Sequence, residues 1–215
     1  MNNAGSRWKR RGALALVALL ILISGTLWYL RGRNSPPIPA AGGLSFTNFT
    51  AIETPFYLQR DDRWKNETIG SGETLAKVGC TVSSLAMALE HYGRPFTPQT
   101  LNEALKANGG YTRRGWLRWD AVAKISEGQV FVRLFDRPTH ADLDSALQAR
   151  HPVLIKVFIN RVVPHWVLVV GKEGTEYLMR DPLNEARTLT RVSSYQSDIY
   201  GVRIVEPARK QTPNP

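Results

Sequence analysis

Residues 79–89, Gly-Cys-Thr-Val-Ser-Ser-Leu-Ala-Met-Ala-Leu, hold the clearest helical pattern of the chain and its only cysteine. From Val82 onward the apolar residues recur at positions i, i+3, i+4 and i+7, which predicts a helix over residues 80–92. Cys80 then lies at the helix start, where the helix dipole and the unpaired N–H groups favour a thiolate. This position suits a nucleophilic cysteine, and a small apolar residue buried at a helix start is the alternative.

The segments that follow this helix change character along the chain. Residues 98–108 and 119–126 are predicted to be helical, and Thr139 is predicted to cap a further helix. Later runs rich in β-branched and aromatic residues predict strands at 129–135, 152–159, 165–171, 176–181, 187–192 and 201–206. Helices first and short strands afterwards predict an α+β domain with segregated layers over residues 46–206.

An apolar run precedes this domain. Residues 12–30 contain no charged side chain, and their length, at about 1.5 Å per residue, nearly crosses a hydrocarbon core of roughly 30 Å. More basic residues precede the run than follow it, so residues 1–11 are expected to stay in the cytoplasm. We predict a single transmembrane helix in a bacterial inner membrane, with the C-terminal domain in the periplasm or outside the cell. A cleavable signal peptide is the alternative.

Two polar segments flank the predicted domain. Residues 31–45 are rich in Pro and Gly and predict an extended linker, whereas residues 207–215 predict a disordered tail. The net charge is +10, but six basic residues lie within residues 7–33, before any acidic residue appears. The remainder of about +4 is too small to predict a nucleic-acid partner.

The single cysteine restricts the chemistry further. No intramolecular disulfide and no multi-cysteine zinc or iron–sulfur site can form. The four histidines show neither HExxH nor a comparable spacing, so we predict no metal and no cofactor. Cys80 is therefore either a buried apolar residue or a reactive thiol.

A histidine and an aspartate are predicted to face each other across a hairpin. The runs around His165 and Asp181 predict two strands that turn near Gly174, a residue that tolerates positive φ. In a hairpin centred near Glu173, residues whose numbers sum to 346 are paired, as His165 and Asp181 are. Cross-strand Cβ atoms lie about 5 Å apart, close enough for a carboxylate to hold one imidazole nitrogen and turn the other toward a thiolate. The alternative is two side chains bonded separately to backbone at strand ends.

Gln59 is a candidate for stabilising charge in such a site. Attack of a thiolate on a carbonyl creates an oxyanion, and a glutamine side-chain N–H beside the N–H of Cys80 would stabilise it. Gln59 lies just before the charged run Arg60-Asp61-Asp62. An exposed glutamine beside a charged turn is therefore the alternative.

An ordered set of residues between about 54 and 182 is similar to one known family. The set consists of Gln59 with Trp64, the stretch 79–89, Tyr92-Gly93, Thr97-Pro98, Leu101-Asn102, Gly109-Gly110-Tyr111, Trp119, His165-Trp166-Val167 and Asp181-Pro182. It resembles the cysteine peptidase family 39-like domains, papain-like proteins related to the bacteriocin-leader peptidases. The resemblance implies a papain-like fold, with an N-terminal helical part and an antiparallel β-sheet. It implies Cys80 as nucleophile, His165 as general base and acid, Asp181 as the residue that orients the histidine, and Gln59 as the oxyanion-hole residue.

These observations together predict a membrane-anchored papain-like cysteine peptidase that hydrolyses a peptide or amide bond through an acyl-enzyme on Cys80. Its expected partners are a peptide or protein substrate and the membrane, and no nucleic acid is expected. The sequence does not predict an oligomeric state. Transglutaminase-like acyl transfer and peptidoglycan hydrolysis use the same residues and stay open. A non-catalytic papain-like module that binds a cell-envelope partner is the alternative from another class, although such a module has no physical need for all four site residues.

Overall fold

The structure is a computed structural model that describes residues 19–20, 36–48 and 51–208. The chain divides into two units, residues 1–36 and 37–215. The second unit contains the predicted site and is described below.

The predicted membrane span lies almost wholly outside the described residues. Of residues 12–30, only Leu19 and Leu20 are described, and both are helical. No helix in the described part of the chain combines the length and the apolar character that a membrane crossing requires. The anchor therefore stays a prediction from the sequence.

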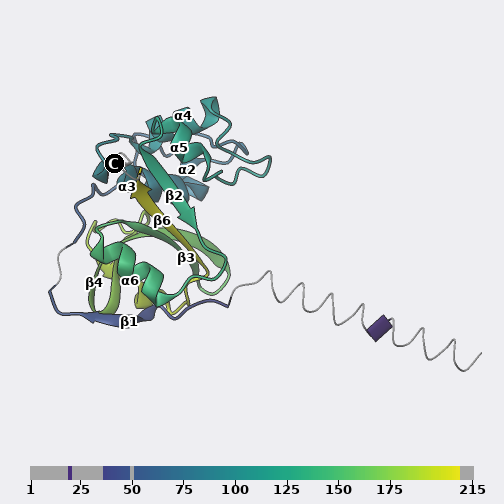
Figure 1. The fold of residues 1–215 in the computed structure, drawn as a ribbon. Coiled ribbons are helices and arrows are strands. Elements are labelled where there is room, and N and C mark those ends of the chain that lie inside the picture. The colour runs from purple at the N-terminus through teal and green to yellow at the C-terminus, as the bar shows by residue number, and fades with distance from the viewer. Residues whose placement is uncertain (1–18, 21–35, 49–50, 209–215) are drawn as a thin grey trace, which may run out of the picture. The chain divides into compact units, whose positions relative to one another are not determined.

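An antiparallel sheet forms the frame of the second unit (Figure 1). Its strand order is β1-β4-β3-β6-β2, and β5 pairs with β4 outside this path. The strands are β1 (Ala41–Phe46), β2 (Val130–Leu134), β3 (Val153–Ile159), β4 (Val163–Arg180), β5 (Thr190–Arg191) and β6 (Gly201–Pro207).

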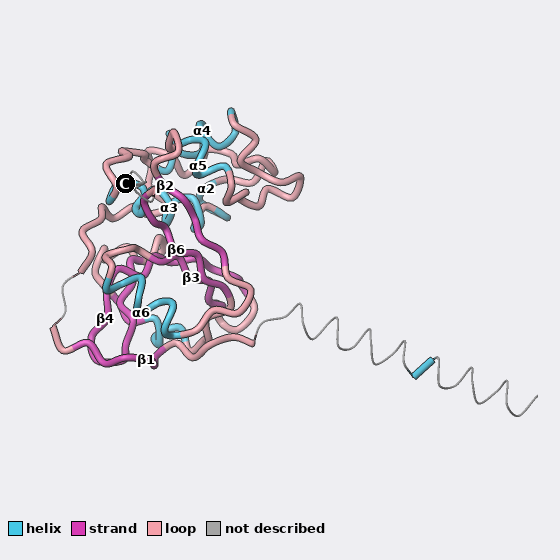
Figure 2. The backbone as a smooth tube through the Cα atoms, in the orientation of Figure 1, coloured by secondary structure: helices cyan, strands magenta, loops and turns pink. Residues whose placement is uncertain are grey.

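The helices fall into two groups around this sheet. They are α2 (Leu75–Val78), α3 (Cys80–His91), α4 (Pro98–Ala107), α5 (Ala121–Ile125) and α6 (His140–Gln148), with the 3-10 helix η1 at Val192–Tyr195. Helices α2 to α5 lie together, and α3 packs on β4 (Figure 2). Helix α6 lies apart from them and packs on β1, β3 and β4. The α+β class with an antiparallel sheet is confirmed.

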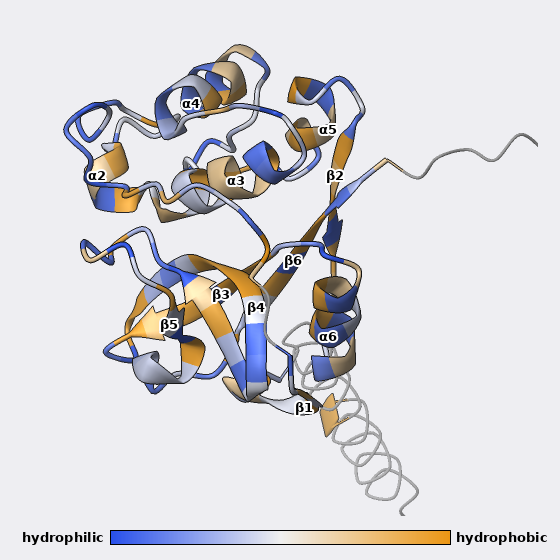
Figure 3. Ribbon diagram, turned by 90° about the vertical axis from the view of Figure 1, so that its left-hand side faces the viewer, coloured by the Kyte–Doolittle hydropathy of each residue, from blue (hydrophilic) through white to orange (hydrophobic). Residues whose placement is uncertain are grey.

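The main core lies where α3 meets the sheet. Leu85, Met87 and Leu89 of α3 are fully buried, as are Leu154 and Ile155 of β3. Strand β3 is coloured hydrophobic over most of its length in Figure 3. Burial of each such side chain contributes roughly 1.5–3 kcal/mol. The helix that starts at the cysteine is therefore fixed in position by its own packing.

Threonine side chains start two of the predicted helices. Thr97 Oγ1 accepts from the N–H of Thr100 at the start of α4, and Thr139 Oγ1 accepts from the N–H of Asp142 at the start of α6. In both helices the third residue bonds back to the cap, which satisfies two otherwise unpaired donors. Both predicted helices are confirmed, and the predicted strands 129–135, 152–159 and 201–206 appear as β2, β3 and β6.

The predicted hairpin around Gly174 lies within the single element β4. A straight strand would hold His165 and Asp181 roughly 50 Å apart, at about 3.3 Å per residue. Their side chains are 2.7 Å apart, so the chain reverses within this element. Gly174 has a φ of +56°, as the turn requires.

The predicted linker over residues 31–45 is wrong at its C-terminal end. Strand β1 begins at Ala41 and pairs with β4, so the sheet starts before the predicted domain boundary. Gly42 and Gly43 are glycines because the strand passes close to α6. A Cβ at Gly42 would collide with the side chain of His140, and one at Gly43 with the side chains of His140 and Asp144. Glycines that looked like a flexible spacer are therefore packing positions.

Two further differences concern short elements. Helix α2 was not predicted, because four residues are too few to show a helical period. The predicted strand 187–192 is reduced to the two residues of β5, and the chain then enters η1. Ser193 Oγ donates to Glu176 and Ser194 Oγ donates to the carbonyl of Arg191. The bond from Ser194, to a residue three positions before it, favours a turn over a continued strand.

Candidate active site

Cys80 is the first residue of α3 and is 9% exposed. Gly79 precedes it as the N-cap, and a Cβ there would collide with the backbone of Leu75 in α2. Only glycine allows α2 to approach this closely. The thiol therefore occupies a fixed position at the positive end of a 12-residue helix.

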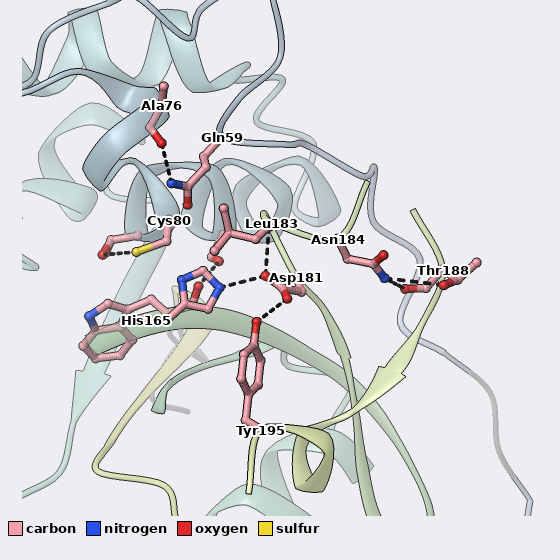
Figure 4. A network of polar contacts seen from close by, with 12 residues as sticks. Gln59, Ala76, Cys80, His165, Asp181, Leu183, Asn184, Thr188 and Tyr195 are labelled. Carbon is pink, nitrogen blue, oxygen red and sulfur yellow. Dashed lines mark hydrogen bonds and ion pairs between the residues drawn. The ribbon is translucent and has the colours of Figure 1, made fainter. Parts of the chain in front are cut away.

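His165 and Asp181 are brought together by the reversal of β4. His165 Nε2 lies 2.7 Å from Asp181 Oδ1, and both side chains are buried. Asp181 Oδ1 also accepts from the N–H of Leu183 at 2.8 Å, and Asp181 Oδ2 accepts from the hydroxyl of Tyr195. Figure 4 shows the imidazole ring between Asp181 and Cys80. Since Nε2 is held by the carboxylate, Nδ1 is the nitrogen available to the sulfur.

The protonation states of this group follow from its contacts. Burial opposes a charge on His165, but the hydrogen bonds with Asp181 and Cys80 outweigh it and raise the pKa of His165 to about 9. Burial likewise opposes the thiolate, yet the hydrogen bond and the charge of His165 hold the pKa of Cys80 below its usual value. Despite burial, the bond and charge of His165 also lower the pKa of Asp181. All three shifts act in favour of a thiolate beside an imidazolium, with an ionised carboxylate behind it.

Gln59 is buried beside Cys80 rather than exposed (Figure 4). Its Nε2 donates to the carbonyl of Ala76 at 2.9 Å, and its backbone N–H donates to the carbonyl of Pro182 at 3.0 Å. These bonds tie it both to α2 and to the residue after Asp181. An amide nitrogen carries two hydrogens, so one remains for a ligand in the site.

The sequence of residues 51–200 matches the Peptidase_C39 like family. The chain belongs to this family. A crystal structure described as that of a candidate C39-like peptidase from Bacillus anthracis is similar to 75% of this chain and 100% of its own, at 15% identity and a TM-score of 0.48. No curated protein matches the chain.

Membership of the Peptidase_C39 like family supports a peptidase of the cysteine type, with a peptide or protein as substrate. In this C39-like chain the four residues singled out from the sequence, Gln59, Cys80, His165 and Asp181, lie in one place (Figure 4). They come from the loop before α2, the start of α3, the strand β4 and the residue after it.

Tyr195 was missed by the sequence analysis. Besides its bond to Asp181, its ring lies edge-on to His165 with centroids 5.8 Å apart. Tyr195 belongs to η1, and the local sequence Ser193-Ser194-Tyr195 does not predict a hydrogen bond to a residue far away in the chain. Only the fold brings it to the carboxylate.

The remaining histidines lie elsewhere. His91 Nε2 lies 3.0 Å from the carbonyl of Arg150, and the ring nitrogens of His140 and His151 contact tyrosine hydroxyls. Within residues 36–48 and 51–208, no three His, Cys, Asp or Glu side chains gather into a group that could hold a metal ion.

Proposed function

We propose that this C39-like chain hydrolyses a peptide bond by nucleophilic attack of the Cys80 thiolate. The observation that carries the proposal is the buried His165–Asp181 pair at the start of the helix that presents the thiol. A carboxylate-held imidazole next to a cysteine is the arrangement that activates sulfur for acyl transfer. Membrane anchoring by residues 12–30, and an exported domain, are proposed on the sequence alone.

The reaction would proceed in two steps. The Cys80 sulfur attacks the carbonyl carbon, and the oxyanion that forms accepts from the N–H of Cys80 and from Gln59 Nε2. The C–N bond then breaks, and His165 gives its proton to the leaving amine. In the second step His165 takes a proton from water, hydroxide attacks the thioester, and the carboxylic acid product leaves as the thiolate re-forms.

Alkylation of the full-length protein with iodoacetamide from pH 4 to 10 tests the state of the thiol. Because Cys80 is the only cysteine, every label reports on it, and Cys80→Ser gives the background. We expect fast labelling well below pH 8 in the native protein and an ordinary thiol profile, with a pKa near 8.5, in His165→Ala. Slow labelling and an ordinary profile in both proteins would favour a non-catalytic binding module.

Peptide hydrolysis should show a different pH profile from alkylation. Attack needs the thiolate, which is present above the lowered pKa of Cys80, whereas expulsion of the amine needs protonated His165, which is lost as pH rises through about 9. Hydrolysis is therefore expected to decline above about pH 9 while alkylation does not. Cys80→Ala and His165→Ala should each abolish hydrolysis with an unchanged circular dichroism spectrum, and hydrolysis by either variant would contradict the assignment.

A further inference from the structure

Two basic residues on one face of the sheet have no acidic partner in the part of the chain that the structure describes. Lys156 of β3 is opposite Trp166 of β4 and opposite Gly201 of β6, and Arg203 lies two residues beyond Gly201. Side chains two residues apart on a strand point to the same face, so Lys156, Trp166 and Arg203 share it. Both basic side chains are half-buried, and neither forms an ion pair with any described residue. We call these two residues the Lys156–Arg203 patch.

Tryptophan rings hold the guanidinium of this patch in place. Arg203 Cζ lies 5.4 Å from the ring centroid of Trp119 and 5.6 Å from that of Trp166, and the two centroids are 5.4 Å apart. Arg203 Nη1 donates to the carbonyl of Val202, whereas its buried Nε has no partner among the described residues. The side chain is thus positioned by aromatic packing while part of its hydrogen-bonding capacity is unused.

Trp166 connects the Lys156–Arg203 patch to the nucleophile. It follows His165 in sequence, and its carbonyl accepts from Ser84 Oγ at 3.2 Å, one helical turn beyond Cys80. The Trp166 backbone is also among the groups that lower the pKa of Cys80. The two basic side chains project from β3, which pairs with β4, and from β6, the next strand of the sheet, on the face that Trp166 shares.

Burial makes both charges of the Lys156–Arg203 patch less favourable than they would be in water. Burial lowers the pKa of Lys156, and the nearby charge of Arg203 lowers it further; burial also lowers the pKa of Arg203. Two like charges in a half-buried place are stabilised when an anion joins them. A carboxylate also matches the forked N–H donors of a guanidinium.

We propose that Lys156 and Arg203 bind a carboxylate of the peptide substrate within a few residues of the bond that Cys80 attacks. This inference deepens the proposed peptidase function and rests on it. Lys156 is opposite Trp166, the residue after His165, and an extended peptide advances about 3.3 Å per residue. A carboxylate two or three residues from that bond is the one that Lys156 and Arg203 would bind. The carboxylate belongs to an Asp or Glu side chain or to the C-terminus of a short peptide.

Cleavage of a synthetic peptide library by the full-length protein, followed by mass spectrometry, would first locate a cut sequence. Matched peptides would then carry Glu or Gln at each of the three positions on either side of the bond, with a free or amidated C-terminus. We expect kcat/KM about tenfold higher for one Glu peptide than for its Gln partner, mainly through KM. If the free C-terminus supplies the carboxylate instead, amidation is the change that lowers kcat/KM.

Lys156→Gln and Arg203→Gln should each bring this ratio close to one, because they lower kcat/KM for the Glu peptide more than for the Gln peptide. The Lys156 side chain forms no hydrogen bond with any described residue, so its variant stays informative even if loss of Arg203 disturbs the tryptophans. Lys106→Gln, which removes an exposed charge from α4, is the matched control and should leave the ratio unchanged.

The outcomes separate the subsite from the peptidase function. Equal rates for the Glu and Gln peptides and for both C-termini, or a preference kept in both patch variants, would overturn the subsite and leave the peptidase standing. A ratio lowered equally by Lys106→Gln would assign the preference to overall charge and also overturn the subsite. Cleavage of no peptide beyond the level of Cys80→Ser would overturn the peptidase function, and the subsite with it.

Discussion

At the scale of single residues, Asp181 has the most polar contacts in the site. One carboxylate oxygen receives His165 Nε2–H and the backbone N–H of Leu183, and the other receives the hydroxyl of Tyr195. Burial and the neighbouring carboxylate raise the pKa of Tyr195, so its hydroxyl keeps its proton and acts as donor. We regard Tyr195 as a residue that positions Asp181 rather than one that touches the substrate.

Tyr195→Phe is expected to lower kcat/KM about tenfold. Without the hydroxyl, one oxygen of the buried carboxylate loses its donor, which makes the charge of Asp181 less favourable and supports the imidazolium of His165 less well. The pKa of His165 then falls from about 9, and the alkaline limb of the hydrolysis profile moves to lower pH. The measurement is kcat/KM against pH.

The control for this prediction is Tyr200→Phe, which changes a half-exposed tyrosine that packs on Phe158. It should leave the pH profile unchanged. A Tyr195→Phe protein with a lower melting temperature but an unmoved alkaline limb would show that the hydroxyl supports the fold and not the histidine.

At the scale of elements, a buried ion pair joins β1, α6 and β4. Lys172 Nζ donates to Asp144 Oδ1 and to the carbonyl of Gly42, both at 2.6 Å, and the ion pair is almost completely inaccessible. Asp144 also accepts from Tyr177 and from the N–H of Leu44. Both oxygens of the carboxylate thus accept hydrogen bonds, and the first strand of the domain is held through them.

Asp144→Ala is expected to lower the free energy of unfolding by about 3–5 kcal/mol, because it leaves the ammonium of Lys172 buried and unpaired. Urea denaturation would measure the loss. The double variant Asp144→Ala/Lys172→Met should lose less than Asp144→Ala alone, since no charge is left uncompensated. For comparison, Lys77→Ala, which breaks the exposed pair with Glu73, should cost less than about 1 kcal/mol. Equal losses for the single and double variants would contradict the role given to the buried charge.

At the scale of the whole molecule, the boundary of the folded domain lies before β1. A chain shortened to residues 36–215 keeps β1, whereas one shortened to residues 47–215 loses it together with two partners of the buried ion pair, Gly42 and Leu44. We expect the shorter chain to melt about 5–10 °C lower in a calorimetric scan. Equal melting temperatures would show that residues 41–46 belong to the linker and do not stabilise the folded domain.

Much of the fold follows from local patterns. The α3 helix shows its period in Val82, Leu85 and Leu89, and α4 and α6 begin at threonines that cap them through bonds within three residues. The sequence does not predict why Gly42 and Gly43 are glycines. They are small because α6 passes close by, and no residue near them in the sequence reveals that neighbour.

The sequence by itself determined the α+β class, the helix that starts at Cys80 and the contact between His165 and Asp181, because periodicity, capping and hairpin register act over a few residues. Only the tertiary structure decided the burial of Gln59 beside the thiol, the bond from Tyr195 and the patch formed by Lys156 and Arg203. Each of these depends on packing between segments far apart in the chain, which no local pattern reveals.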